Sequence, residues 1–145
     1  MGSGIAAQIA NADLPVLLLD LPAKTAGQPH AAAAAIDRLL ESDPPQLMHK
    51  KRAQLSATGT IDDDFDKLAD CDLVIEAVIE QLPVKQALYK RLHQTIPPNC
   101  IVTSNTSTIP ISLLVAEMPV DFSRRFAITH YFNPVRFMRL LELVR

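Results

Sequence analysis

The residues that could carry out acid–base chemistry lie near the C-terminal end of the sequence, in Phe126–Glu142 (FAITHYFNPVRFMRLLE). This segment begins with a short apolar run, which predicts a buried strand, and His130 follows at its end. Asn133 and Pro134 then turn the chain, and a second apolar run carries Glu142. A histidine at a strand end with a carboxylate on the neighbouring element is the layout of an oriented general base. The alternative is a structural histidine in a loop beside a surface glutamate.

The composition excludes several classes of protein. The chain has 145 residues, 48% of them hydrophobic and 21% charged, which predicts one domain with a sizeable core. The net charge of −2 and the lack of a basic stripe argue against nucleic acid as a partner. No apolar run approaches the length of a membrane span, and the N-terminus does not resemble a secretion signal. Cys71 and Cys100 lack the spacing of a zinc site, so we expect no metal and two buried, reduced thiols in a cytoplasmic protein.

The elements that must position His130 alternate between helix and strand along the chain. Proline, glycine and polar residues separate apolar runs that fit buried strands from segments with helical spacing. The alternation predicts an α/β fold of Rossmann-like type, with a mostly parallel sheet and helices on both faces. The expected elements are a helix that starts at Gly2 and ends at Asp13 and Pro15, strand Val16–Leu19, helix Ala31–Leu40, a helical turn at Phe65–Leu68, strand Asp72–Val78, helix Val84–Thr95 with Leu88 and Leu92 facing inward, strand Cys100–Thr103, helix Ile111–Met118, and the strand that leads to His130.

Polar side chains follow four of the predicted strands at the point where each one ends. In a parallel sheet the carboxyl ends of the strands meet at one edge, and ligands bind there. The sequence therefore predicts a binding or active site at this edge. The residues in question are Asp20, Glu76 with Glu80, Ser104–Ser107, and His130 with Asn133.

Each of these positions also has a plainer explanation. Ser104–Ser107 could cap the helix that Pro110 begins, and Asp20 could be a solvated strand end. Lys85 could be an ordinary surface lysine at a helix start, and Glu76 could be purely structural. A serine hydrolase that uses Ser107 and His130 would need a strained G-x-S-x-G turn around the serine, which this sequence lacks.

The N-terminus begins at a helix, whereas an α/β domain of this kind normally opens with a strand and a glycine-rich turn. Met1-Gly2 looks like the tail of a G-x-G-x-x-G fingerprint, with Gly2 as the third glycine. Asp20 follows at about the distance at which an acidic residue binds the ribose 2′-hydroxyl of NAD and repels the 2′-phosphate of NADP. The first strand of the fold and the first two fingerprint glycines are absent from the sequence.

Five segments, in this order and spacing, resemble the NAD-binding domain of the 3-hydroxyacyl-CoA dehydrogenase family. The resemblance covers essentially the whole chain, although residues 22–55 align poorly. It implies an NAD-dependent oxidoreductase that converts 3-hydroxyacyl-CoA to 3-oxoacyl-CoA in fatty-acid β-oxidation. The segments are MGSGIAAQIANA, LLLD, CDLVIEAVIEQLPVKQALYKRL, SNTST and THYFNPVRFMRLLELV.

The resemblance also implies roles for single residues in catalysis. His130 matches the family's catalytic histidine, which takes the proton of the substrate hydroxyl as hydride leaves for the nicotinamide. Glu142 matches its partner glutamate, which fixes the tautomer of the ring. Ser107 and Asn133 match residues that hydrogen-bond the substrate oxygen or orient the cofactor amide.

Four positions match residues that bind NAD in the family. Gly2 matches the last fingerprint glycine, and Asp20 matches the acid after the second strand. Glu80 matches the second glutamate of the E-A-V-I-E block, and Lys85 is the lysine five residues later.

Departures from the family pattern leave two interpretations open. Asp13 stands where relatives have a glycine that ends the helix. The family's helical C-terminal domain, which supplies dimer contacts, does not follow Arg145. We therefore expect residues 1–145 to be a single NAD-binding domain, incomplete at its N-terminus, from a parent enzyme that forms homodimers. The alternative is a catalytically inactive, truncated fragment of such an enzyme.

Overall fold

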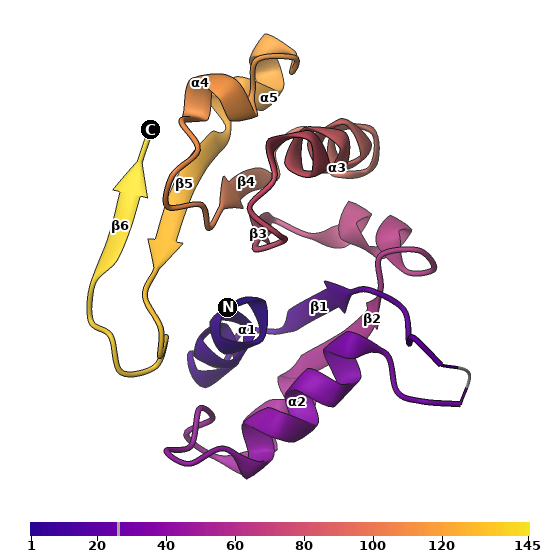
Figure 1. Cartoon of the computed structure of the whole chain (residues 1–145), viewed down its shortest axis with the longest axis vertical. Coiled ribbons are helices and arrows are strands. Elements are labelled where there is room, and N and C mark those ends of the chain that lie inside the picture. The colour runs from indigo at the N-terminus through magenta and orange to yellow at the C-terminus, as the bar shows by residue number, and fades with distance from the viewer. Residues whose placement is uncertain (26) are drawn as a thin grey trace. The chain divides into compact units, whose positions relative to one another are not determined.

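The computed structural model describes residues 1–25 and 27–145, which form two compact units. The first unit contains Met1–Phe65 and Phe132–Arg139, and the second contains Asp66–Tyr131 and Leu140–Arg145. Each unit combines helices with a sheet, as the labelled elements of Figure 1 show. Among the described helices, none is long and apolar enough to cross a membrane.

The first unit is built on two parallel strands. β1 pairs with β2 in parallel, from Val16 opposite Ser56 to Asp20 opposite Thr60. The short link between α1 and β1 contains Asp13, whose φ of 64° places it in the left-handed region. The elements are α1 (Gly2–Asn11), β1 (Val16–Asp20), α2 (Ala31–Glu41), a 3₁₀ helix (Lys50–Leu55) and β2 (Ser56–Thr60).

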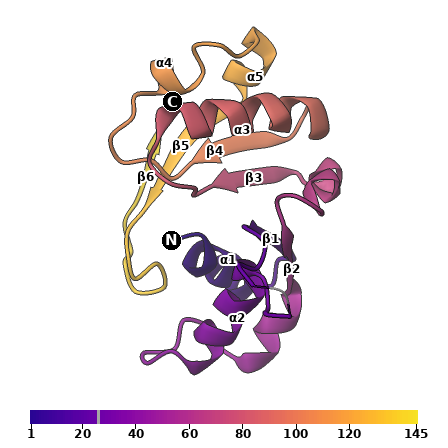
Figure 2. The same ribbon diagram turned by 45° about the vertical axis from the view of Figure 1, so that its right-hand side comes forward.

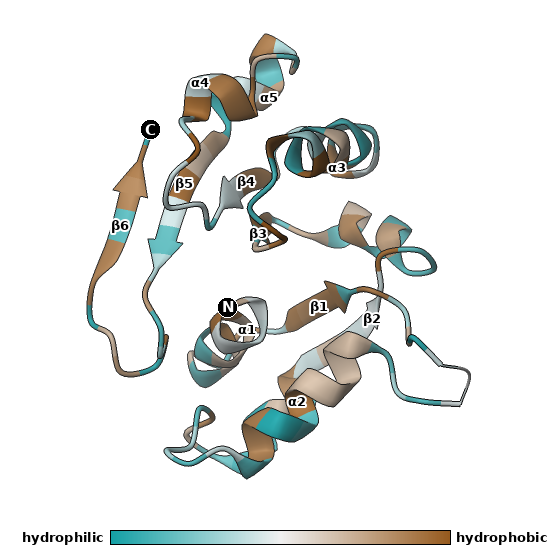
Figure 3. Ribbon diagram, in the orientation of Figure 1, coloured by the Kyte–Doolittle hydropathy of each residue, from teal (hydrophilic) through white to brown (hydrophobic). Residues whose placement is uncertain are grey.

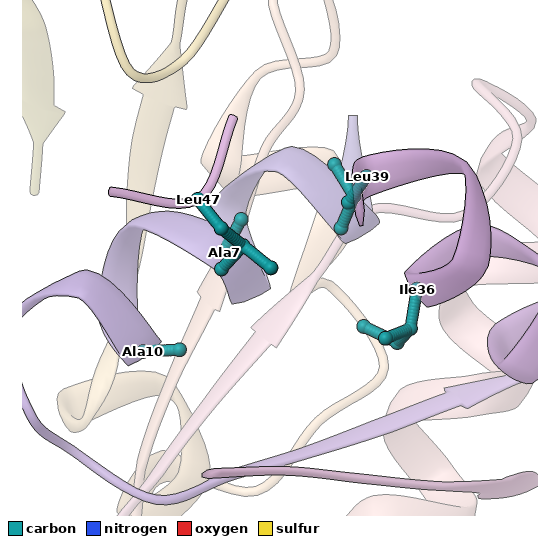
Figure 4. Packing of buried hydrophobic residues seen from close by; sticks show 5 residues of the cluster. All are labelled: Ala7, Ala10, Ile36, Leu39 and Leu47. Atoms are coloured by element: carbon teal, nitrogen blue, oxygen red, sulfur yellow. The ribbon is translucent and has the colours of Figure 1, made fainter. Parts of the chain in front are cut away.

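Small side chains on α1 allow close packing in the first unit. Ala7 and Ala10 lie against Ile36 and Leu39 of α2, and Leu47 completes the cluster (Figure 4). All five side chains are less than one tenth exposed. Removing these apolar surfaces from water is the main favourable contribution to folding of this unit.

The second unit contains a four-stranded sheet in the order β3-β4-β5-β6. β3, β4 and β5 are parallel, and β6 is antiparallel to β5. Figure 2 shows these strands side by side, with α3 running along them. A 3₁₀ helix, Phe65–Asp70, precedes β3 (Leu73–Glu76), α3 (Leu82–Thr95), β4 (Ile101–Ser104), α4 (Ile111–Leu114), α5 (Val120–Arg124), β5 (Phe126–Tyr131) and β6 (Leu141–Val144).

Aromatic rings form much of the core of the second unit. The ring of Tyr89 on α3 lies 5.1 Å from the ring of Phe126 and 6.0 Å from that of Phe122, measured between centroids. Leu92, one turn further along α3, is also buried. The phenol of Tyr89 therefore approaches the sheet from a fixed face of α3.

The structure confirms the α/β class and the mostly parallel strands, and it corrects several details. Ser56–Thr60 is a strand that the sequence analysis missed, because its residues SATGT contain no apolar run; Figure 3 shows β2 pale beside the brown β1. The helix predicted at Ile111–Met118 ends at Leu114, and α5 begins after Pro119. The strand expected to reach Val78 ends at Glu76.

Two predictions of burial were wrong. Leu88 was expected to face inward on α3, but it is half-buried, and the buried positions are Lys85, Tyr89 and Leu92. Cys71 was expected to be buried and is only half-buried, whereas Cys100 is fully buried as predicted. Both thiols are free. Burial raises the pKa of the Cys100 thiol, which therefore stays protonated near neutrality.

We predict that the backbone conformation of Asp13, more than its charge, determines what this residue contributes to stability. Its carboxylate forms an exposed ion pair with Arg52. Asp13→Ala should lower the free energy of unfolding by about 1 kcal/mol, because alanine adopts the left-handed region poorly. Asp13→Asn tolerates that region and loses only the ion pair, so its loss should stay below about 0.5 kcal/mol. Equal losses in urea unfolding of the two variants would show that the ion pair is the larger contribution.

Candidate functional site

An open pocket of about 220 Å³ lies in the second unit, beside the carboxyl end of β4. It brings together residues from the loop after β4, from β5 and from β6. The pocket contains the two residues that were singled out for acid–base chemistry and three hydroxyl residues from the SNTST block. Its lining residues are Thr106–Pro110, Ile128, His130, Glu142 and Val144.

The sheet register places His130 directly opposite Glu142. β5 and β6 are antiparallel, and these two residues are cross-strand partners on one face of the sheet. The His130 Nδ1 atom lies 2.8 Å from the Glu142 Oε2 atom, which is a hydrogen-bond distance. The histidine side chain is 21% exposed and that of the glutamate 51% exposed. The arrangement keeps one face of the pair open to a ligand while the strands hold the ring in place.

The loop after β4 anchors its polar side chains in different directions. Just before the loop, the hydroxyl of Ser104 at the end of β4 donates to Glu76 at 2.6 Å. The Asn105 Oδ1 atom accepts from the backbone N–H of Tyr131 at 2.8 Å, which ties the loop to the end of β5. Thr106 donates to Glu80, and Ser107 is left at the surface of the pocket. These bonds fix the loop from both sides.

The alternative role for this block, capping the helix after Pro110, is wrong. Pro110 is itself the residue that precedes α4, and no side chain caps that helix. The Thr106 Oγ atom accepts instead from the backbone N–H groups of Thr108 and Ile109, at 3.4 and 3.2 Å. The block therefore forms its own turn beside the pocket.

A buried ion pair lies behind this loop. The Lys85 Nζ atom is 2.7 Å from the Glu76 Oε1 atom, and both side chains are only 1% exposed. The same ammonium lies 3.3 Å from the Glu80 Oε2 atom. Glu76 also accepts from the Tyr89 phenol at 2.6 Å and from the backbone N–H of Val78 at 2.7 Å. The expectation that Lys85 could be an ordinary surface lysine is wrong, and Glu76 has the structural position that was considered for it.

The ionisation of two groups follows from these contacts. Burial alone would raise the pKa of Glu80, but the hydrogen bond from Thr106 and the charge of Lys85 outweigh that effect and lower it below the ordinary 4.5. Burial, reinforced by the charge of Glu76, raises the pKa of Tyr89 far above its ordinary 10.0. At neutral pH Glu80 is therefore an anion that accepts hydrogen bonds, and Tyr89 is a neutral donor.

The remaining predicted site residues, Gly2, Asp20 and Asn133, lie in the first unit. Asp20 is the last residue of β1, and its exposed carboxylate accepts from the backbone N–H of Leu21 at 2.7 Å. Gly2 is the first residue of α1, whose first turn carries neither a side-chain cap nor an acidic residue. An uncapped helix start with small residues suits a phosphate group, and an exposed carboxylate suits a ribose hydroxyl. Asn133 is exposed and follows β5 in the segment Phe132–Arg139.

Sequence reasoning missed the roles of Tyr89 and Thr108. Tyr89 binds Glu76, and the Thr108 hydroxyl donates to Glu80 at 3.1 Å. A usable signal was present, because Lys85 and Tyr89 are four residues apart and so lie on one face of a helix. A lysine and a tyrosine on the face that also carries Leu92 indicate a buried partner for both, and Glu76 at a strand end was available.

Comparison with known proteins relates the whole chain to one family of enzymes. The family model described as "3-hydroxyacyl-CoA dehydrogenase, NAD binding domain" matches residues 1–145. A probable 3-hydroxyacyl-CoA dehydrogenase of Deinococcus radiodurans is 42% identical over 99% of this chain, which spans 42% of that relative. A putative fatty acid oxidation complex trifunctional enzyme of Rickettsia felis is 41% identical over 99% of the chain, which spans 20% of that protein.

Solved structures show the same fold. The crystal structure of 3-hydroxybutyryl-CoA dehydrogenase from Escherichia coli matches 99% of this chain with a TM-score of 0.81 and 36% sequence identity, and the match covers 30% of that protein. The structure of (S)-3-hydroxybutyryl-CoA dehydrogenase from Ralstonia eutropha matches 99% of the chain with a TM-score of 0.74 and 32% identity, over 50% of its own length. The chain is thus shorter than two thirds of each of these relatives.

We predict that the two lysines on α3 that bind glutamates differ sharply in their contribution to stability. Lys85→Met should lower the free energy of unfolding by about 3 kcal/mol or more, because it leaves the Glu76 carboxylate buried without its cation. Lys90 pairs with Glu117 where both side chains are more than half exposed, so Lys90→Met should cost less than about 0.5 kcal/mol. Urea unfolding at neutral pH measures both, and similar losses would contradict the assignment of a buried ion pair.

Proposed function

The chain belongs to the 3-hydroxyacyl-CoA dehydrogenase family, in its NAD-binding domain, and from this premise we propose that it acts in the NAD-dependent oxidation of 3-hydroxyacyl-CoA to 3-oxoacyl-CoA in fatty-acid β-oxidation. The observation that carries the proposal is the hydrogen bond between His130 and Glu142 beside Ser107 in one pocket. A general base with an oriented ring and an adjacent hydroxyl is what removal of a proton from an alcohol needs.

In the proposed reaction His130 accepts the proton of the substrate 3-hydroxyl. Its Nδ1 atom is engaged by Glu142, so the proton is transferred to Nε2. When bound, NAD would supply the redox chemistry as the acceptor of the hydride from the carbon that bears this hydroxyl. The ring becomes an imidazolium, and the carboxylate 2.8 Å away stabilises its positive charge. The pair therefore lowers the barrier at the step where charge develops.

Other residues would position the reactants. We assign to the Ser107 hydroxyl, which lies at the pocket surface, a hydrogen bond to the substrate oxygen. Asn133 would bind the same oxygen or orient the amide of the nicotinamide. Asp20 would bind the ribose hydroxyls of NAD and disfavour NADP, and Gly2 would approach the pyrophosphate. Support for these roles comes from their residue types and from their match to the family pattern.

We also propose that Glu80 and Lys85 contribute to NAD binding, each in a different way. Lys85 is 1% exposed, whereas the Glu80 side chain is 40% exposed. Glu80 is therefore the one of the two that would contact NAD directly, and Lys85 would act by holding Glu80 in place.

Further properties of the whole protein are part of the same proposal. We propose residues 1–145 as one NAD-binding domain of a parent enzyme that forms a homodimer and acts in the cytoplasm, where the free thiols of Cys71 and Cys100 would stay reduced. One relative is a peroxisomal fatty acid beta-oxidation multifunctional protein from rice. The competing proposal is that these residues bind no NAD productively and lack activity by themselves.

The first test is NADH binding to this chain, followed by nicotinamide fluorescence or calorimetry. We expect saturable binding that Asp20→Ala weakens about tenfold or more, because the ribose loses its acceptor. Asp37→Ala removes another exposed carboxylate of the first unit and should leave the affinity unchanged. A folded chain that does not bind NADH would favour the inactive alternative, and equal effects of the two substitutions would contradict the role of Asp20.

The second test concerns the His130–Glu142 pair during turnover of 3-hydroxybutyryl-CoA with NAD. His130→Gln should lower kcat by about 10²–10⁴ with little change in the affinity for NADH, because it removes only the base. Glu142→Gln should give a smaller loss, since the base remains but its orientation and charge stabilisation weaken. Glu117→Gln, an exposed glutamate elsewhere in the second unit, serves as control. A full-rate His130→Gln enzyme would rule out the proposed base.

A further inference from the structure

We infer that Thr106 is a positioning residue whose hydroxyl, held by Glu80 and by the buried Lys85–Glu76 pair, fixes the turn that presents Ser107 to the pocket. The structural part of this inference stands on contacts within the second unit. Its consequence for turnover rests on the proposed function. Thr106 itself transfers neither the proton nor the hydride in the proposed reaction.

All hydrogen-bonding capacity of the Thr106 hydroxyl is used. A hydroxyl has one proton to donate and two lone pairs that accept. Thr106 donates to the Glu80 Oε1 atom, and it accepts from the backbone N–H groups of Thr108 and Ile109. The residue is only 1% exposed, so water does not compete for these positions. The hydroxyl is therefore held in one orientation, and both N–H groups of the turn depend on it.

The direction of these bonds depends on Glu80 remaining an acceptor. Its carboxylate is ionised at neutral pH, and it also receives the Thr108 hydroxyl at 3.1 Å and the Lys85 ammonium at 3.3 Å. A side chain without an acceptor oxygen at this position would let the Thr106 hydroxyl rotate, and its lone pairs would turn away from the two N–H groups. The directions of the hydrogen bonds in this turn therefore depend on Glu80.

Lys85 cannot leave Glu80 without breaking the buried network. Its ammonium is 2.7 Å from Glu76, which in turn accepts from the Tyr89 phenol and the Ser104 hydroxyl, both at 2.6 Å. The cation is therefore held by Glu76 at the end of β3, a carboxylate that Tyr89 of α3 and Ser104 of β4 also bind. Glu76, Lys85 and Glu80 thus connect the buried core to the turn that contains Thr106.

Ser107 gains a defined place from this arrangement. It stands between Thr106, which is anchored to Glu80, and Thr108, which is anchored to the same carboxylate. On the preceding side Asn105 binds the backbone of Tyr131, the residue after His130. The loop and the end of β5 are thus tied together, so the separation of Ser107 and His130 depends on the turn.

The test compares Thr106→Val, which removes the hydroxyl at nearly constant volume, with Thr106→Ser, which keeps it. Thr106→Val should speed amide hydrogen exchange of Thr108 and Ile109 by about tenfold or more, and Thr106→Ser should stay near the wild-type rates. Thr95→Val removes a hydroxyl that binds only a carbonyl on the exposed side of α3, and it should change neither amide.

The functional readout is turnover of 3-hydroxybutyryl-CoA with NAD. Thr106→Val should lower kcat/KM about tenfold, with Thr106→Ser restoring it, because the displaced Ser107 no longer meets the substrate oxygen. A merely structural role would lower the amount of folded protein and leave kcat/KM per folded molecule unchanged, and that result would overturn the functional part.

The two parts of the inference can fail separately. Unchanged exchange of Thr108 and Ile109 in Thr106→Val would overturn the inference whatever the activity. An inactive wild-type protein would overturn the proposed function, while the exchange rates would still decide whether the hydroxyl holds the turn. Should Thr106→Val not fold, Glu80→Met removes both acceptor oxygens and should also speed exchange of the Thr108 and Ile109 amides, and unchanged rates there would overturn the inference equally.

Discussion

The ion pair between Glu76 and Lys85 is the interaction on which the second unit depends most. Two charges removed from water are tolerated only when each is bonded on all sides, and here Glu76 has four donors, from Val78, Lys85, Tyr89 and Ser104. Those donors come from the loop after β3, from α3 and from the end of β4. A single carboxylate therefore fixes where a strand ends, where a helix lies on the sheet and where the next loop begins. An apolar core could stabilise these elements as well, but it would not specify their positions in this way.

The pocket is assembled by a change of strand direction at the edge of the sheet. Three parallel strands bring their carboxyl ends together, which places the SNTST loop and His130 near one another. β6 then returns antiparallel to β5, and its register places Glu142 opposite His130. The antiparallel strand thus supplies the partner that a purely parallel sheet would lack.

The sequence predicted those helices and strands whose local residue pattern matches the structure that they adopt in the folded chain. Val16–Leu19 is wholly apolar and lies in the strand Val16–Asp20, and Ala31–Glu41 has high helix propensity and is a helix. The strand Ser56–Thr60 could not be predicted in this way, because it is defined by backbone pairing with β1 and its side chains carry no pattern. The burial of Lys85 was also beyond local reasoning, since a lysine is buried only when an anion elsewhere in the chain requires it. The pairing of His130 with Glu142 was predicted from their places on neighbouring elements and from the resemblance to the family, and the register that brings them together became visible only in the structure.

The position of β6 has a kinetic consequence. It is the last strand in the order β3-β4-β5-β6, it is four residues long, and Leu141 and Leu143 are exposed. Short strands at a sheet edge open and close far more often than the whole domain unfolds, because few bonds must break. Each such opening separates Glu142 from His130 while the buried network around Glu76 stays intact. The His130–Glu142 pair and the buried network around Glu76 therefore fluctuate on different timescales, and the lifetime of the assembled pair is set by the edge of the sheet.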